Sequence, residues 1–203
     1  MSIVIIGWGS LVWDKRNLEL KTGWRTTGPK LPVEFARISD GGKGRLTLVL
    51  VSDELAQVLQ SSQTLWAESK CASLTDAIEQ LRVRESNTRK SWIGHVNLAS
   101  HQVGTSPIAD SIAEWGKKVG NITDVIWTAI PSNFKDIRQH DLTEAAAVKY
   151  LCDLQHSDCP TFLLAAEYIR KAPASVQTPV RVALRKTFGK LCEDEELPAE
   201  LFD

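Results

Sequence analysis

Two short segments of this chain carry residue types that could do chemistry together. The first is the turn Gly7-Trp8-Gly9-Ser10-Leu11, which follows a short apolar run, and the second ends in the carboxylate of Glu85. Glycines let a backbone turn sharply and approach a ligand closely, so the N–H groups of such a turn can converge on a carboxylate or an oxyanion. A carboxylate nearby can take up a proton and return it. The turn is therefore a candidate anion cradle, and Glu85 is a candidate acid/base.

Each segment also has a purely structural interpretation. The glycines can simply permit a tight turn between strands. Glu85 can be one partner of a surface ion-pair cluster, because the basic residues at 82, 84, 89 and 90 are interspersed with acids and are typical of a solvated face. The turn lacks the third glycine of a dinucleotide fingerprint and the Lys-Ser/Thr pair of a Walker loop, which disfavours nucleotide binding. Ser10 is not in a G-x-S-x-G elbow, so we interpret its hydroxyl as a ligand to substrate or loop.

The elements that would position these residues can be predicted from periodicity. Apolar and β-branched residues predict strands at 3–7, 33–39, 45–51, 64–68, 92–98 and 124–130. The glycines between 40 and 44 suit a hairpin loop. Glu34 and Glu68 lie in these strand-like segments and are weaker candidate acids, since alternation places a strand residue outside as often as inside.

Helices are predicted in the middle and in the last third of the chain. Ser73 is a good N-cap for a helix from about 74 to 84, whose end delivers Glu85. A second helix carries Ile108, Ile112, Trp115 and Val119 on one face and stops at Gly120. From Asp141 onward the pattern is helical alone, with Thr178-Pro179 as an N-cap and first helical residue.

The length and the order of elements predict one domain, either α+β or a barrel flanked by helices. A chain of 203 residues can bury one substantial core. We expect residues 1–140 to form a domain of strands and flanking helices, and residues 141–203 to form a helical C-terminal extension packed on the same domain.

Composition narrows the partners and the compartment. A net charge of -1, from 24 basic and 25 acidic residues, gives no reason to expect nucleic acid or an anionic membrane as partner. The N-terminus resembles no secretion signal and no apolar run approaches membrane-spanning length, so we expect a cytoplasmic soluble protein. The scattered cysteines and histidines match no zinc or redox spacing. We therefore predict packing thiols, no metal and no cofactor; the oligomeric state is left open.

Six segments together resemble the gamma-glutamylcyclotransferase-like superfamily, in its bacterial and mostly uncharacterised branch. They are residues 7–14, 32–39, 45–50, 77–85, 167–173 and 178–181, which span most of the chain. The resemblance implies a small closed barrel of mixed strands flanked by helices, with one pocket at its mouth.

The same resemblance implies a reaction and roles for particular residues. The free α-amine of a gamma-glutamyl amine, amino acid or peptide attacks its own side-chain carbonyl, which forms 5-oxoproline and releases the amine. Glutathione is one such substrate. Glu85 would be the general acid/base, and Gly7, Trp8, Gly9, Ser10 and Leu11 would bind the substrate, with Trp8 in the place of a common tyrosine.

Two other functions use the same residues. One is a non-catalytic module that binds a small carboxylate or another protein, and the other is a hydrolase in which Glu85 activates water. The position of Glu85 distinguishes a binding module from an enzyme. A carboxylate that converges with the Gly9-Ser10 turn favours an enzyme, whereas one that points away favours the module.

Overall fold

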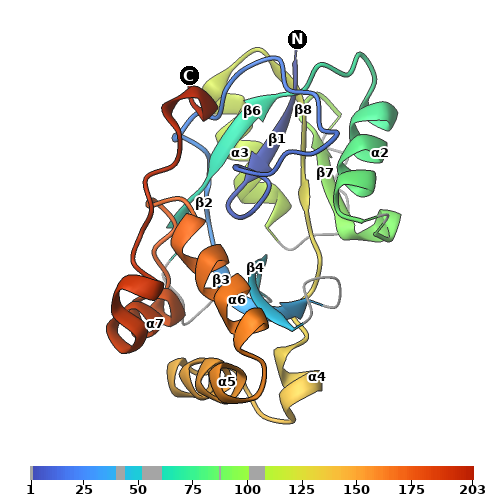
Figure 1. Ribbon diagram of the computed structural model, residues 1–203. Helices are drawn as coiled ribbons and strands as arrows, with labels where there is room; N and C mark the ends of the chain where they lie inside the picture. Colours follow the sequence, from blue (N-terminus) through green and yellow to red (C-terminus); the bar gives the residue numbers. More distant parts are fainter. Residues whose placement is uncertain (1, 40–43, 52–60, 87, 101–107) are drawn as a thin grey trace. The chain divides into compact units, whose positions relative to one another are not determined.

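The computed structural model describes residues 2–39, 44–51, 61–86, 88–100 and 108–203, and their fold is α+β (Figure 1). The predicted hairpin loop at 40–44 lies almost wholly outside the described residues. The chain divides into two compact units. Unit 1 contains Met1–Leu31, Gln63–Ile130 and Pro198–Asp203, and unit 2 contains Pro32–Ser62 and Pro131–Leu197.

Unit 1 is built on a four-stranded sheet. Its strands are β1 (Ser2–Gly7), β6 (Leu65–Glu68), β7 (Ile93–Asn97) and β8 (Ile122–Thr128), in the order β6-β1-β8-β7. β1 runs parallel to β8 and antiparallel to β6, and β7 runs antiparallel to β8. Ile6 is the register partner of Trp127, so the carboxyl ends of β1 and β8 lie side by side. All four strands were predicted from the sequence, with ends that differ by a few residues.

Two α-helices of unit 1 pack against β7 and β8. They are α2 (Leu74–Arg84) and α3 (Ala109–Val119). The predicted cap of α2 is confirmed, because the Ser73 hydroxyl accepts from the N–H of Asp76 at 3.1 Å. Gly120 ends α3 with a φ of 77°, a conformation that glycine adopts without a steric penalty. The short 3-10 helices η1 (Lys90–Trp92) and η3 (Ala199–Leu201) complete this unit.

Unit 2 combines one hairpin with most of the C-terminal helices. β3 (Val33–Ser39) pairs antiparallel with β4 (Arg45–Leu50), with a bulge between Phe35 and Arg37. Its helices are α4 (Phe134–Arg138), α5 (Glu144–Ser157), α6 (Cys159–Lys171), α7 (Pro179–Phe188) and the 3-10 helix η2 (Gly189–Leu191). The hairpin packs on α6 through β4 and on α7 through β3. The predicted start of α7 is confirmed, with Thr178 as N-cap and Pro179 as the first helical residue.

The expected closed barrel is not found among the described strands. β6 and β7 are the outer strands of the four-stranded sheet, and within the described residues β6 is bordered on its other side only by isolated bridges such as Arg25 to Trp66. Among the described strands, β3 pairs with β4 alone. The hairpin forms a two-stranded sheet of its own and packs against helices of its own unit. The two-residue strands β2 (Lys30–Leu31) and β5 (Ser62–Gln63) occur where the chain passes from one unit to the other.

The boundary between the two units does not fall after residue 140, where the sequence pattern changes to helix alone. Residues 33–50 group with the helices that follow residue 131, and the last residues group with unit 1. The return of the C-terminus is held by backbone hydrogen bonds, because the N–H of Trp24 donates to the carbonyl of Leu201 at 2.7 Å and the N–H of Asp203 donates to Trp24 at 3.3 Å. Such pairings join residues far apart in sequence, so local patterns do not predict them.

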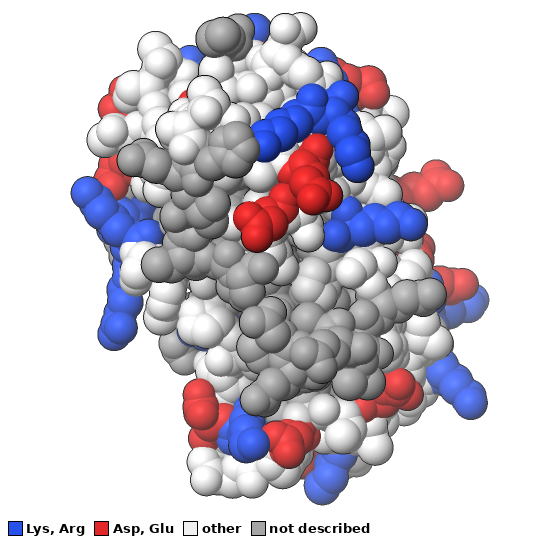
Figure 2. Space-filling model, turned by 180° about the vertical axis from the view of Figure 1, so that it is seen from behind, with Lys and Arg blue, Asp and Glu red and all other residues white. Residues whose placement is uncertain are grey.

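Charges of both signs are interspersed on the face that Figure 2 presents, in keeping with the near-zero net charge. Within the described parts of the chain, no helix has the length and apolar character needed to cross a membrane.

Candidate functional site

The turn after β1 is a single helical turn. The carbonyl of Gly9 accepts from the N–H of Val12 at 2.9 Å, and the carbonyl of Ser10 accepts from Asp14 at 2.8 Å. Backbone N–H groups at the start of a helical turn can face a ligand. The N–H groups predicted to form a cradle are therefore at the start of this turn, at the carboxyl end of β1.

Gly7 is explained by packing and not by backbone freedom. The φ angle of Gly7 is not positive, so its backbone conformation does not require a glycine. A Cβ at this position would lie 2.8 Å from two ring carbons of Trp24, a contact that real Cβ atoms do not make. Trp8 and Leu11 are buried, each with 5% of its surface exposed, and Ser10 is half-buried. The aromatic and apolar side chains of the turn thus fix its backbone on the core of unit 1.

Glu85 caps the C-terminus of α2, where the structure gives its two carboxylate oxygens different surroundings. Oε1 accepts from Nη1 of Arg84 at 2.7 Å and from the hydroxyl of Thr128 at 3.3 Å. No described residue donates a hydrogen bond to Oε2. The side chain is 17% exposed, so the carboxylate is accessible at the edge of the fold.

Arg84 joins the acid to the turn. Its side chain is only 3% exposed. Nη2 donates to the Ser10 hydroxyl at 3.2 Å and to the carbonyl of Asp14 at 2.6 Å, and Nε donates to the same carbonyl at 3.1 Å. One guanidinium therefore contacts Glu85 and the Gly9-Ser10 turn at once. The structure brings the predicted acid and the predicted cradle together.

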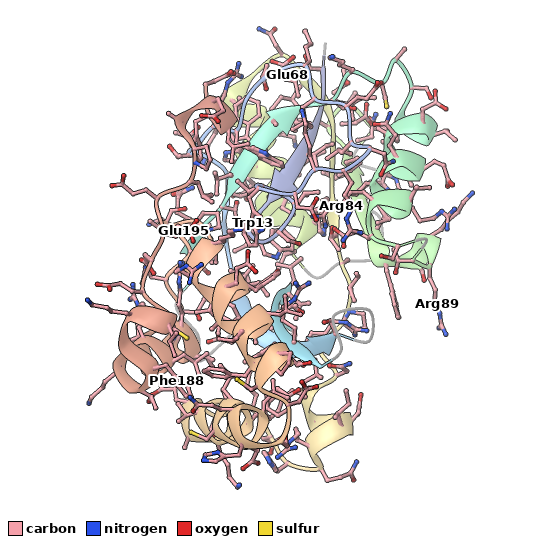
Figure 3. The ribbon with its side chains drawn as sticks, viewed as in Figure 1. Trp13, Glu68, Arg84, Arg89, Phe188 and Glu195 are labelled. Carbon is pink, nitrogen blue, oxygen red and sulfur yellow. The ribbon has the colours of Figure 1, made fainter. Side chains whose placement is uncertain are left out.

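The prediction that the basic residues around Glu85 form a solvated face is wrong for Arg84. Its neighbours follow that prediction, since Arg82 pairs with Glu79 at 2.6 Å and exposed Arg89 lies over the ring of Trp92. In Figure 3, Arg84 lies where the end of α2 faces the segment after β1, whereas Arg89 extends away from the ribbon. Helical spacing accounts for the difference, because Arg84 lies on the buried face of α2 with Ala77 and Leu81.

The guanidinium of Arg84 is largely occupied by the protein itself. Four of its five N–H donors contact Asp14, Ser10 and Glu85. Arg16 fastens the same region from the surface, where its Nη1 donates to the carbonyl of Arg84 at 3.1 Å. Arg84 thus orients the acid and the turn, and a ligand carboxylate would be left to the backbone N–H groups of the turn.

The two weaker candidate acids have structural partners. Glu34, in unit 2, is 1% exposed; Oε1 accepts from Thr178 and from the N–H of Phe35 at 2.7 Å, and Oε2 accepts from the N–H of Val180 at 3.3 Å. Burial raises the pKa of Glu34, although these hydrogen bonds oppose the shift. Hydrogen bonds from Ser2 and Lys21 lower the pKa of Glu68. Glu68 thus has a hydroxyl partner in Ser2 and an arginine partner in Arg25, but neither Glu34 nor Glu68 is joined to the turn at 9–11.

The cysteines contribute no cluster to this site. All four are free thiols; Cys192 is buried, which raises its pKa to about 11, whereas Cys159 is exposed and so is not a packing thiol. No group of three or more His, Cys, Asp or Glu side chains in the described ranges could hold a metal ion.

Sequence reasoning missed Arg84 and Thr128 as residues of this site. The available signal for Arg84 was its spacing on the apolar face of α2. The position of Thr128 depends on strand order, because it ends β8 beside the carboxyl end of β1. Ligand sites in sheets with parallel strands commonly lie at such ends.

Comparison of the chain with protein-family models, with curated proteins and with solved structures gives no match in any of the three.

Proposed function

We propose that this protein is a gamma-glutamylcyclotransferase-like enzyme. It would convert a gamma-glutamyl amine, amino acid or peptide into 5-oxoproline and release the amine. The observation that carries the proposal is the position of Arg84, which hydrogen-bonds to both Glu85 and Ser10 and so holds an accessible acid beside a glycine-flanked turn.

The first requirement of this reaction is to fold the substrate. The attacking amine and the carbonyl carbon belong to one molecule, and an oriented intramolecular attack can lower the barrier by about 7–11 kcal/mol. The first N–H groups of the turn at 9–11 would hold the substrate carboxylate or the oxyanion that forms at the carbonyl. Trp8 and Leu11 are buried, which anchors this turn on the core of unit 1.

The second requirement is proton transfer, for which one carboxylate suffices. The α-ammonium gives a proton to Glu85, and its nitrogen then forms the new bond to the carbonyl carbon. Glu85 passes this proton to the amide nitrogen as the amide C–N bond breaks. The ring nitrogen gives its surplus second proton to Glu85, from which the released amine takes it up as an ammonium ion. No redox partner or cofactor enters this sequence. The accessible edge position of Glu85 and the unoccupied Oε2 support this role.

The test is release of 5-oxoproline from a panel of gamma-glutamyl amines, dipeptides and glutathione. Glu85→Gln keeps the shape of the side chain and removes the base, so turnover should fall at least about 100-fold. Glu79→Gln is the matched control, because Glu79 lies on the same helix, has 45% of its side chain exposed and pairs with Arg82. It should stay within about twofold of the unaltered protein.

Absence of turnover on every compound, by protein whose melting transition is intact, would contradict the proposal. The non-catalytic alternative would then predict that glutamate or 5-oxoproline still binds, and titration calorimetry with both compounds tests this. Ser10→Ala should weaken such binding, since Ser10 is the contact of the turn with Arg84.

A further inference from the structure

Thr128 holds one oxygen of Glu85 from a rigid position. It is the last residue of β8, and its register partner in β7 is Ile93. The backbone of Thr128 is therefore fixed by its pairing with β7 in the sheet of unit 1. Its hydroxyl donates to Oε1 of Glu85 at 3.3 Å, which is the oxygen that Arg84 also contacts. Two donors from two different elements thus converge on a single oxygen atom.

This convergence restricts the carboxylate in a way that a single ion pair would not. One donor leaves the carboxylate plane free to turn about the contact. Two donors on Oε1, one from the end of α2 and one from the end of β8, restrict that rotation and leave Oε2 without a donor among the described residues. Catalytic groups need this kind of support, because small errors in orientation cost much of the rate.

We infer that Thr128 is a positioning residue for the proposed reaction, and that Oε2 of Glu85 is the oxygen that takes the proton from the substrate amine and returns it to the leaving amine. The inference rests on the proposed function. It assigns the two oxygens of Glu85 separate tasks: Oε1 is held by the protein and Oε2 faces the substrate.

Thr128 allows a cleaner test than Arg84 does. The guanidinium of Arg84 also holds the carbonyl of Asp14 and the hydroxyl of Ser10, so its removal disturbs the turn together with the acid. Thr128→Val has nearly the same shape and lacks only the hydroxyl. Thr128→Ser keeps the hydroxyl and lacks only the methyl group. The pair separates the hydrogen bond from packing.

On the best substrate of the panel, Thr128→Val should lower kcat about tenfold and leave KM within about twofold, because orientation of the acid changes and the binding turn does not. Thr128→Ser should keep at least about half of kcat. A Thr128→Val enzyme with the kcat of the unaltered protein would overturn the inference. An equal loss in both variants would overturn it as well, since the methyl group would then be responsible.

Crystal structures of the same three proteins give a readout that does not depend on turnover. The inference predicts that the Glu85 carboxylate keeps its orientation in Thr128→Ser and rotates in Thr128→Val. An unchanged carboxylate in Thr128→Val would overturn the positioning role. If the unaltered protein releases no 5-oxoproline, the proposed function fails, and these structures still decide whether Thr128 orients Glu85.

Discussion

Glu85 in unit 1 and Glu34 in unit 2 are both carboxylates at helix ends, but the two helix ends differ. Glu34 accepts hydrogen bonds at the N-terminus of α7, where the helix dipole favours a negative group, and both of its oxygens are occupied. Glu85 lies at the C-terminus of α2, where the dipole disfavours it, and only Oε1 is held. Glu34 is 1% exposed and the Glu85 side chain is 17% exposed.

Glu34 is a buried acid that contributes hydrogen bonds to the fold, whereas Glu85 is a partly exposed acid that other residues hold in place. The fold itself accounts for Glu34, which satisfies backbone donors at a helix start. Glu85 satisfies no helix start. It lies at a helix C-terminus, where the dipole is unfavourable, and the nearly buried Arg84 holds its carboxylate there. Residues that local rules do not explain are commonly functional.

The two buried arginines repeat the contrast. Arg181 of unit 2 is 0% exposed and donates to the carbonyls of Ala172, Pro173 and Val176, with Asp194 as its ion-pair partner at 3.0 Å. Burial lowers the pKa of Arg181 to about 10. Arg84 instead reaches a hydroxyl and an accessible carboxylate. Arg181 therefore supports only structure, and Arg84 supports structure and site.

Replacement of the two arginines by methionine should produce the largest effects and separate these roles. Arg181→Met leaves three buried carbonyls without their donor, so the free energy of unfolding should fall by about 3–5 kcal/mol. The turnover of the molecules that remain folded should not change. Arg84→Met should lower stability and also lower turnover per folded molecule at least about tenfold. Urea denaturation and 5-oxoproline release measure the two quantities.

Lys186→Met is the matched control on α7, because Lys186 is exposed. Its unfolding free energy should change by less than about 0.5 kcal/mol. Equal loss of turnover in Arg181→Met and Arg84→Met, corrected for the folded fraction, would refute the distinction between the two arginines.

Gly7→Ala should have an intermediate effect that links packing to the site. The new Cβ would meet the Trp24 ring at 2.8 Å, and Trp24 is only 2% exposed, so overpacking should cost about 1–3 kcal/mol of stability. Gly189→Ala is a useful contrast, because no atom lies within 4 Å of its Cβ position and only its φ of 53° opposes the change. Its loss should be about 1 kcal/mol, and turnover should fall in Gly7→Ala alone. Thermal melting and turnover of both variants test this.

The smallest predicted effect is a pH dependence of stability from Glu34. Burial raises its pKa in the folded state, so the folded protein binds the proton more tightly than the unfolded chain does. The stabilising contribution is full below the unfolded pKa and is lost as pH rises through the folded pKa. Urea unfolding between about pH 4 and pH 7 should therefore show the unaltered protein losing stability relative to Glu34→Gln as the pH rises.

Glu68 supplies a control of opposite sign. Hydrogen bonds from Ser2 and Lys21 lower its pKa, so its contribution is present above the unfolded pKa and is lost as pH falls. The unaltered protein should therefore be more stable than Glu68→Gln at the neutral end of the range, and this difference in unfolding free energy should be smallest at the acid end. The same sign of pH dependence in both variants would contradict the assignment for Glu34.

Capping preferences and apolar periodicity predicted the individual helices and strands. Ser73 and Thr178-Pro179 begin helices as capping preferences require, and the strands were found from their apolar residues. The grouping of residues 33–50 with the C-terminal helices depends on contacts between distant segments, which no local pattern contains. The closed barrel was expected from the resemblance and not from periodicity, and the described strands do not form it.

Only those parts of the candidate site that follow from local sequence could be predicted. Glu85 and the turn at 7–11 are visible as residue types, but the turn and the acid are brought together by Arg84. Its position three residues after Leu81 places it on the apolar face of α2, which predicts burial, although its charge argued for a solvated face. Thr128 could not be found without the order β6-β1-β8-β7.

The most direct test of the account is the initial rate of 5-oxoproline release by Glu85→Gln and by Glu79→Gln on the same gamma-glutamyl substrate, at equal folded concentrations. If Glu85 is the acid/base, the rate should be at least about 100-fold lower for Glu85→Gln than for Glu79→Gln. Equal rates for the two variants would contradict the role of Glu85 as the acid/base of this protein.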